Sequence, residues 1–165
     1  MNTTAQPGEI ERYQPIVDAL LGVFADRLKT IVLFGSQARR EARQDSDHDL
    51  FVVIEDVPRD PLARNRLVRG PLLPILHHLP GAIGFVVKTP GEVQVNLTPF
   101  LLDVCTEGIC LYGAEYFEPY RRKALSALQQ SGLRRRKTGT VRMWVFPQAP
   151  SGNWELSWEG YREGI

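Results

Sequence analysis

The sequence predicts a mixed α/β (α+β) fold, in which a small mixed β-sheet is flanked by helices. Three short apolar runs, at residues 30–34, 50–54 and 82–88, have the length and composition of buried strands. Between them lie segments whose apolar residues recur every three to four positions, as they do on the buried face of a helix. Strands that alternate with helices in this way pack as one sheet covered by helical layers.

Length and composition restrict the class of protein. A chain of 165 residues with 43% hydrophobic and 24% charged residues is typical of one globular domain, not of a disordered, collagen-like or coiled-coil chain. No apolar run approaches the ~18–20 residues of a membrane span, and residues 1–8 lack the basic and apolar regions of a secretory signal. Cys105 and Cys110 form no CxxC pair, so neither a disulfide framework nor a zinc site is indicated. We therefore expect a cytoplasmic protein with no membrane partner.

Prolines and glycines set the boundaries of the predicted elements. Pro15 suits the first turn of a helix, so the first helix is expected to become regular there. Pro71 and Pro74 must interrupt the helix that contains them. In chain order, the predicted elements are a helix over residues 10–28, a strand over 30–34, a helix over 36–42, a strand over 50–54, an interrupted helix over 60–79, a strand over 82–88, a helix over 100–107 ended by Gly108, a strand over 109–112 and a helix over 116–130.

The last of these helices has one apolar side. Tyr120, Ala124, Leu125 and Leu128 follow helical spacing and are predicted to face inward. The basic run at residues 121–123 is expected to be a solvated face.

Charge divides the chain into two parts. Residues 1–132 contain 14 Lys and Arg against 16 Asp and Glu, a net of −2. Residues 133–165 contain six basic against three acidic residues, a net of +3, and all three tryptophans. The net charge of +1 therefore hides a slightly acidic core, residues 1–132, and a basic, Trp-rich C-terminal extension, residues 133–165.

The C-terminal extension is predicted to contain a β-hairpin. Residues 140–146 and 154–158 alternate between apolar and polar positions, and residues 147–152 between them have loop composition. The basic run at residues 134–137 has two interpretations, which the sequence leaves open. It contacts the phosphates of a nucleotide or a nucleic acid, or it is a flexible linker to an aromatic hairpin that packs on the core.

The strongest functional signal lies between the first two strands. The first strand ends in Gly35-Ser36, where a glycine permits close approach of a ligand and the N–H groups of the following helix can bind an anion. Asp47 and Asp49 stand two residues apart at the start of the second strand and therefore project from the same face. Paired carboxylates suit a hard divalent cation such as Mg²⁺, which in turn binds triphosphate oxygens. The pattern predicts a phosphate-binding loop beside a metal site.

This pattern resembles the polymerase-β-like nucleotidyltransferases, and in particular their minimal type. Residues 35–39 and 46–50 are similar to the family signature almost residue for residue, and a weaker similarity extends to about Tyr112. The resemblance implies a small mixed sheet with flanking helices. It also implies transfer of a nucleoside monophosphate from a nucleoside triphosphate, with release of pyrophosphate.

The resemblance also implies roles for particular residues. Gly35, Ser36 and Arg39 would bind the nucleotide, and Asp47 and Asp49 would be the catalytic carboxylates that ligate Mg²⁺ in a site of the two-metal type. ATP is the expected triphosphate. Many small members of the family are antitoxins paired with a HEPN-domain ribonuclease, which they can adenylylate, so the implied partner is a HEPN-type toxin. Others modify small molecules, usually with a longer helical second domain than this chain can hold.

One expected acid is missing. Members of the family usually have a third carboxylate on a neighbouring strand, and the matching position in residues 82–88 is Gly84. Glu55 is about 20 Å beyond Asp49 along an extended strand. Glu92 follows the end of the strand, and Asp103 lies on a predicted helix, so none of the three is expected to substitute.

Two functions of different classes therefore remain. The first, which the sequence favours, is a Mg²⁺-dependent nucleotidyltransferase whose catalysis is impaired. The second is a non-catalytic module that binds a nucleotide or a partner and has lost the acid at Gly84. Two further positions are noted: Arg40 replaces a common family glycine and either contacts phosphate or points to solvent, and His48 is expected to face away from the aspartates in a structural or solvent-exposed role.

Overall fold

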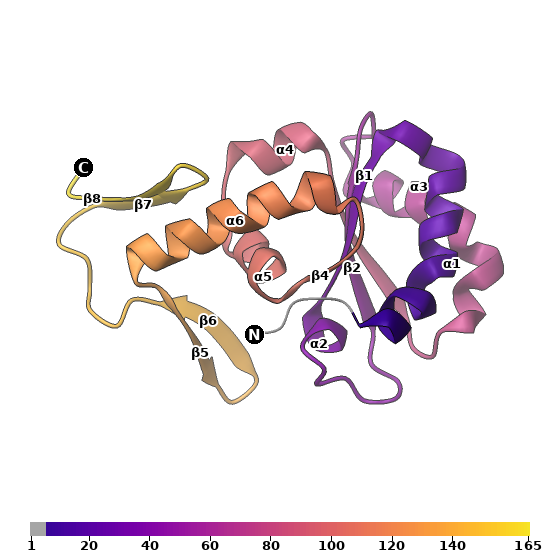
Figure 1. Cartoon of the computed structure of the whole chain (residues 1–165), viewed down its shortest axis with the longest axis horizontal. Coiled ribbons are helices and arrows are strands. Elements are labelled where there is room, and N and C mark those ends of the chain that lie inside the picture. Colours follow the sequence, from indigo (N-terminus) through magenta and orange to yellow (C-terminus); the bar gives the residue numbers. More distant parts are fainter. Residues whose placement is uncertain (1–5) are drawn as a thin grey trace.

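The computed structural model describes residues 6–165, and it confirms the predicted mixed fold (Figure 1). A four-stranded sheet has the order β3-β2-β1-β4, with β2 and β3 parallel and the other neighbours antiparallel. The prediction that no secretory signal is present rests partly on residues 1–5, which lie outside the described residues. The strands are β1 (Leu28–Phe34), β2 (His48–Ile54), β3 (Ile83–Lys88) and β4 (Ile109–Tyr112).

Helices cover both faces of this sheet. In Figure 1, α1 and α3 lie on one side of the strands, and α4, α5 and α6 lie on the other. Within residues 6–165, no helix combines the length and apolar character needed to cross a membrane. The helices are α1 (Pro7–Phe24), α2 (Gly35–Ala38), α3 (Pro61–Leu72), α4 (Pro90–Val95), α5 (Pro99–Glu107) and α6 (Ala114–Ser131), with short 3₁₀ segments at Ala25–Arg27 and Leu73–His78.

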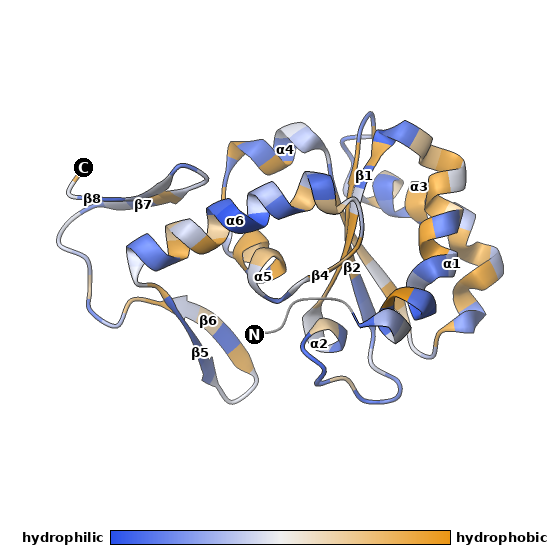
Figure 2. Cartoon of the chain, viewed as in Figure 1, coloured by the Kyte–Doolittle hydropathy of each residue, from blue (hydrophilic) through white to orange (hydrophobic). Residues whose placement is uncertain are grey.

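The alternation of side chains along the strands divides the core into two layers. Leu33 and Leu50 pack with α1 and α3, whereas their neighbours Val32 and Phe51 pack with α5 and α6. In Figure 2, β2 and the helix α5 that covers one face of the sheet are largely coloured as hydrophobic. Both layers are buried, which explains why the strands read as continuous apolar runs instead of alternating ones.

The first helix differs from its prediction at both ends, since it stops at Phe24 and Leu28 already belongs to β1. The first helix begins at Pro7, and Pro15 lies inside it. Pro7 occupies the favoured first-turn position, and the Gln6 N–H donates to Glu9 Oε2 at 2.9 Å, so the helix starts one proline earlier than expected. The predicted interruption of the helix near Pro71 is confirmed, because α3 gives way to a 3₁₀ segment after Leu72.

The helix after Gly35 is also shorter than predicted, ending at Ala38 and not at residue 42. Arg40 has a φ of 58° and lies in the left-handed region. Its N–H donates to Gln37 O at 3.2 Å, and the next N–H, of Glu41, donates to Ser36 O at 3.0 Å. This is the Schellman pattern that normally uses glycine, so the residue at position 40 terminates the helix whatever its side chain does.

Helix α4 was not predicted at all. Thr89 caps it by accepting from the N–H of Glu92 at 3.2 Å, Pro90 takes the first position, and the Glu92 side chain accepts from the N–H of Thr89 at 3.0 Å. This capping box is legible in the sequence, but the helix has only six residues and lacks the periodic apolar pattern on which helix prediction depends.

On α6, two of the predicted positions are wrong. Ala124 and Leu128 are buried as expected, but Leu125 is 46% exposed. Arg121, predicted to be solvated, is only 6% exposed and donates to Cys105 O at 3.1 Å and Gly108 O at 2.8 Å. These are carbonyls at the end of α5, where a cation satisfies acceptors that the helix itself cannot pair.

The C-terminal extension forms two hairpins and not one. The predicted β structure is present, but residues 140–146 pair with the basic run before them, and residues 154–158 pair with the residues that follow. Gly139, with a φ of 62°, permits a two-residue turn directly after the basic strand. The basic run is therefore a strand and not a flexible linker. The strands are β5 (Arg134–Thr138), β6 (Val141–Val145), β7 (Trp154–Ser157) and β8 (Gly160–Glu163).

The second hairpin packs on the core. Trp158, in its turn, is 6% exposed and donates its indole N–H to Val93 O at 2.7 Å. Tyr120 meets the Trp158 ring edge-on at a centroid distance of 4.9 Å. Figure 1 shows β7 and β8 beside α6, as these contacts require. Trp158 thus joins the buried layer beneath α5 and α6, and Trp144 packs against it.

The buried guanidinium on α6 makes a stability prediction. We expect Arg121→Met, which keeps the apolar stem, to lower the free energy of unfolding by about 2–4 kcal/mol, because two buried carbonyls lose their donors. Arg122→Met on the exposed face is the matched control and should change it by less than about 0.5 kcal/mol. Urea denaturation measures both. Equal effects of the two substitutions would contradict a capping role for Arg121.

Candidate functional site

Sheet register brings the motif residues into one row. Asp49 pairs with Phe34 on β1 and with Gly84 on β3, so the three residues lie side by side across the sheet and share one face. The ring of Phe34 packs edge-on against Phe100 of α5 at a centroid distance of 5.3 Å. The carboxylate of Asp49 therefore lies on the side of the sheet that α5 covers, at the edge where β1 ends and β2 begins.

Gly35 is required by both conformation and space. It has a φ of 73°, which side-chain-bearing residues rarely adopt. A Cβ at this position would lie 2.5 Å from Asp49 Oδ2. The glycine therefore brings the turn after β1 directly against the Asp49 carboxylate, and Ser36 follows at the second position of α2. The Gly-Ser turn and the second aspartate of the motif are thus in direct proximity.

The two aspartates differ in their surroundings. Asp47 is exposed just before β2, whereas Asp49 is partly buried within it. Burial is the main cause that raises the pKa of Asp49, the negative charge of Asp47 raises it further, and the positive charge of Arg39 opposes both. Among residues 6–165, neither aspartate forms a salt bridge with a basic side chain. Two neighbouring carboxylates without a basic counter-ion fit a hard cation.

His48 anchors the strand between them, as its predicted structural role requires. It is fully buried on the α1 side of the sheet, where Tyr13 Oη lies 2.6 Å from Nδ1 and Pro80 O lies 2.6 Å from Nε2. The carbonyl can only accept, so Nε2 donates and Nδ1 accepts the hydroxyl of Tyr13. Burial lowers the pKa of His48 and raises that of Tyr13 to about 12, so both groups are neutral. This contact ties the start of β2 to α1 and thereby holds the aspartates in register.

Gly84 lies beside Asp49, at the position where the sequence predicts that a third carboxylate is missing. A Cβ on Gly84 would lie 3.2 Å from Asp49 Oδ1, so a side chain there would point at the carboxylate. The three candidate substitutes are engaged elsewhere: Glu55 pairs with Lys29, Glu92 with Arg64, and Asp103 with Arg135. Within residues 6–165, no group of three or more His, Cys, Asp or Glu side chains could enclose a metal ion. A cation here would have to complete its shell with water or phosphate oxygens.

Arg39, a predicted nucleotide ligand, lies in the turn after α2. Its Nε is 3.0 Å from Glu41 Oε2, and its Nη1 is 3.4 Å from Glu107 Oε2. Arg40 is exposed to solvent, as one of its two predicted roles requires, and its guanidinium pairs at the surface with Glu9 of α1 at 3.4 Å. The involvement of Glu107 was not predicted, since its position at the end of a helix 68 residues away gives no signal in the sequence.

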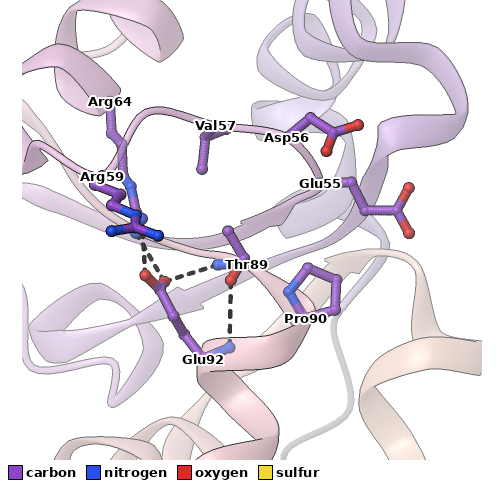
Figure 3. Close-up of a pocket in the computed structure, with 8 residues that line it drawn as sticks. All are labelled: Glu55, Asp56, Val57, Arg59, Arg64, Thr89, Pro90 and Glu92. Carbon is purple, nitrogen blue, oxygen red and sulfur yellow. Dashed lines mark hydrogen bonds and ion pairs between the residues drawn. The ribbon is translucent and has the colours of Figure 1, made fainter.

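A pocket lies at the opposite end of the strands from Asp49. It has a volume of about 470 Å³, and Figure 3 shows Glu55 and Asp56 on one side of it and Arg64 and Glu92 on the other. The two terminal guanidinium nitrogens of Arg64 each donate to a Glu92 carboxylate oxygen at 2.7 Å, and Nη1 also donates to Val87 O at 3.1 Å. Its acids are thus far from Asp49 along the strands, and its central pair is a structural link between α3, β3 and α4.

Comparison with known proteins identifies the same segment of the chain as the site described above. Residues 23–70, which include the Gly-Ser turn and both aspartates, match the family described as polymerase beta, nucleotidyltransferase. The predicted resemblance is therefore confirmed: this chain has a polymerase-β-like nucleotidyltransferase fold, built around that family's sequence motif.

Individual relatives extend the similarity beyond the motif. A Methanocaldococcus jannaschii protein provisionally named as a protein adenylyltransferase is 27% identical over 95 residues, which cover 57% of this chain and 65% of that protein. The match thus spans just under two thirds of that relative's length. A chain in a crystal structure of a toxin–antitoxin with AMP-PNP is 24% identical, with a TM-score of 0.50 over 70% of this chain and 86% of that one. A chain in a complex of a tri-AMPylated Shewanella oneidensis HEPN toxin with an MNT antitoxin is 21% identical, with a TM-score of 0.46 over 72% of this chain and 85% of that one.

The Arg64–Glu92 pair predicts a pH dependence. Hydrogen bonding to Arg64 lowers the pKa of Glu92 from 4.5 to about 2. The unfolded chain therefore binds this proton at a higher pH than the folded one, so the stabilisation is present above pH 4.5 and is lost as pH falls towards 2. Because the Glu92 side chain is 40% exposed, solvent screening reduces the contribution to about 1 kcal/mol.

We expect Glu92→Gln to lower the free energy of unfolding by that amount at pH 7, and the difference from wild type to shrink between pH 5 and pH 2. Glu55→Gln, at an exposed pair with Lys29, is the control and should change stability at pH 7 by less than about 0.5 kcal/mol. Denaturant titrations at several pH values measure both. A difference for Glu92→Gln that stays constant down to pH 2 would contradict the assignment.

Proposed function

We propose that this protein binds a nucleoside triphosphate, ATP in the first instance, together with Mg²⁺, and uses it for nucleotidyl transfer to a protein acceptor. The observation that supports the proposal is the crowding of the Asp49 carboxylate: a Cβ on Gly35 would lie 2.5 Å from one of its oxygens, and a Cβ on Gly84 would lie 3.2 Å from the other. Ser36 and Asp47 lie close to these residues in the sequence. A loop that approaches a carboxylate pair this closely places triphosphate oxygens and a cation within one site. The nucleotidyltransferase fold around these residues supports the same function.

Each proposed ligand has a distinct task. Asp47 and Asp49 would hold Mg²⁺, which when bound supplies positive charge that neutralises the triphosphate and stabilises charge at its oxygens. Ser36 and the N–H groups beside it would orient the phosphates, and Arg39 would pair with them as a planar donor. Partial burial of Asp49 favours the bound cation, because a cation removes the repulsion between the two carboxylates that burial strengthens.

Transfer by the isolated chain is proposed to be slow. A third carboxylate facing Asp49 would complete a second cation site and accept the proton of the attacking hydroxyl, and Gly84 supplies neither. Binding of the triphosphate needs only the loop and the aspartate pair. The alternative function is a catalytically degenerate module that binds a nucleotide or a partner. In its nucleotide-binding form it differs from this proposal only in the rate of the chemical step.

The proposed acceptor and partner is a HEPN-type toxin, with this chain as its antitoxin. Two observations support it: the M. jannaschii relative is named for protein adenylyl transfer, and the toxin–antitoxin chain with the same fold was crystallised with AMP-PNP. Nucleic acid is a weaker candidate, because the two arginines of β5 and β6 that face the core are neutralised by acids there. A cytoplasmic location is part of the same proposal.

Removal of the aspartates tests nucleotide binding. We expect Asp47→Asn and Asp49→Asn each to weaken Mg²⁺-dependent ATP binding by about 10–100-fold, the equivalent of one or two charge-assisted contacts. Asp45→Asn, on the same exposed loop but outside the motif, is the matched control and should leave affinity unchanged. Isothermal titration calorimetry with and without Mg²⁺ measures all of them. ATP binding that is indifferent to Mg²⁺ and to both aspartates would refute the proposed site.

Restoration of the third acid tests catalysis. We expect Gly84→Asp to raise the rate of pyrophosphate release from ATP by at least about 10-fold, since the new carboxylate would face Asp49. Gly84→Asn has the same size without the charge and should give no gain. The assay uses the purified chain, alone and with a HEPN-domain protein. Fast release by the wild type alone, abolished by Asp49→Asn, would show that another group already supplies the missing function.

A further inference from the structure

The first C-terminal hairpin reaches the candidate site through a network of charges. Cross-strand pairing places Arg135 beside Trp144 and Arg142 beside Lys137, so these residues share one face of the hairpin. This face turns towards the core, because Arg135 and Arg142 pair with Glu107 of α5. Arg142 Nη2 lies 2.7 Å from Glu107 Oε1, and Arg135 Nη2 lies 3.2 Å from the same oxygen.

Glu107 is the centre of this network. Its side chain is only 7% exposed, and its two oxygens bind three guanidinium groups, those of Arg39, Arg135 and Arg142. The helix dipole disfavours a carboxylate at the C-terminal end of a helix, and the three neighbouring cations offset that repulsion. One buried acid therefore holds a site residue and two hairpin residues in a single arrangement.

Arg39 and Arg142 are arranged as a pair. Both bind Glu107 on one side, and on the other both bind Glu41 Oε2, at 3.0 Å from Arg39 Nε and 3.4 Å from Arg142 Nη1. Two guanidinium groups that bridge the same two carboxylates must lie beside each other. Arg142 is thus placed next to Arg39, although the two residues are more than one hundred positions apart in the sequence.

The two shared acids differ in how firmly they are held. Glu107 is buried, but the side chain of Glu41 is 48% exposed and lies on the loop that follows α2. The hydrogen bond from Arg39 is the main cause that lowers the pKa of Glu41, and the charges of Arg142 and Lys137 lower it further. An exposed ion pair of this kind contributes little and is exchanged readily for a more highly charged anion.

We propose that Arg142 is a second triphosphate-binding arginine beside Arg39, supplied by the C-terminal hairpin, and that Glu41 occupies the phosphate position of these two arginines until the nucleotide binds. Glu107 is the positioning residue that stays attached to both arginines during this exchange. The inference rests on the proposed function of the same site. It assigns the basic hairpin to the nucleotide and not to a separate nucleic acid.

The test compares substitutions of opposite expected sign by calorimetry with ATP and Mg²⁺. Arg142→Ala should weaken binding about 10-fold, because a charge-assisted contact to phosphate is lost. Arg136→Ala removes the same charge from the outward face of the same hairpin, on the paired strand β5, and it should have no effect. Glu41→Gln should strengthen binding about 2–5-fold, since it removes the competing carboxylate, whereas Glu55→Gln, at an exposed pair remote from the site, should not.

A structural role of Arg142 makes different predictions. If Arg142 only positions Arg39, then adding Arg142→Ala to Arg39→Ala causes no further loss, and the inference is wrong. If Arg142 contacts the triphosphate, the double variant binds more weakly than either single one. Should Arg142→Ala lower the thermal unfolding midpoint, Arg142→Gln, which can still donate to Glu107, takes its place in both comparisons. An unchanged or weakened affinity of Glu41→Gln would also overturn the inference.

These outcomes separate the inference from the function on which it rests. A wild-type chain that does not bind ATP with Mg²⁺ contradicts both. A wild-type chain that binds it, with Asp49→Asn defective and Arg142→Ala equal to Arg136→Ala, overturns only the role of the hairpin.

Discussion

The arrangement of the whole site depends on one crowded carboxylate. Asp49 lies between two glycines, one in the turn that ends β1 and one on the neighbouring strand β3. A Cβ on Gly35 would overlap one carboxylate oxygen at 2.5 Å, and a Cβ on Gly84 would lie 3.2 Å from the other. This is possible only if β2 keeps a single register against both neighbours. The buried hydrogen bonds of His48 to Tyr13 and Pro80 fix that register from the opposite face, because a slip by one residue would bury the aspartates and expose the histidine.

Arginine has three different roles around this sheet, and burial distinguishes them. Arg121 and Arg64 are buried and satisfy carbonyls or a single acid, so they hold helices in place. Arg40 is exposed, and its left-handed backbone, not its side chain, ends α2. Arg39 and Arg142 are intermediate, paired with one buried and one exposed acid, which leaves them partly available to an anionic ligand. The burial of an arginine and of its partners is therefore a better guide to its role than its place in a basic run of the sequence.

Much of the fold was accessible from the sequence, for reasons that are local. Continuous apolar runs identified β1 to β3, because strands that are covered on both faces of the sheet are apolar at successive positions and do not alternate with polar residues. The motif residues were identified because Gly-Ser and Asp-x-Asp each depend on neighbours within a few positions. The predictions failed where local signals competed or were short: Pro7 took the first-turn position that Pro15 also suited, α4 had a capping box without periodicity, and the extension alternated in a way that allowed two different pairings.

Local sequence was thus sufficient for the class of fold, for the two halves of the site and for the absence of an acid at Gly84, because each of these rests on residue types at short spacing. It could not place Glu107 beside Arg39, nor bring Arg142 to the same carboxylate, because these contacts join segments that meet only when α5 and the first hairpin pack together. In the sequence, the basic extension looked separate from the acidic core, because the net charge of each part was summed over consecutive residues. Folding redistributes that charge in space, and there the acids of the core neutralise the inward face of the hairpin and connect it to the candidate nucleotide site.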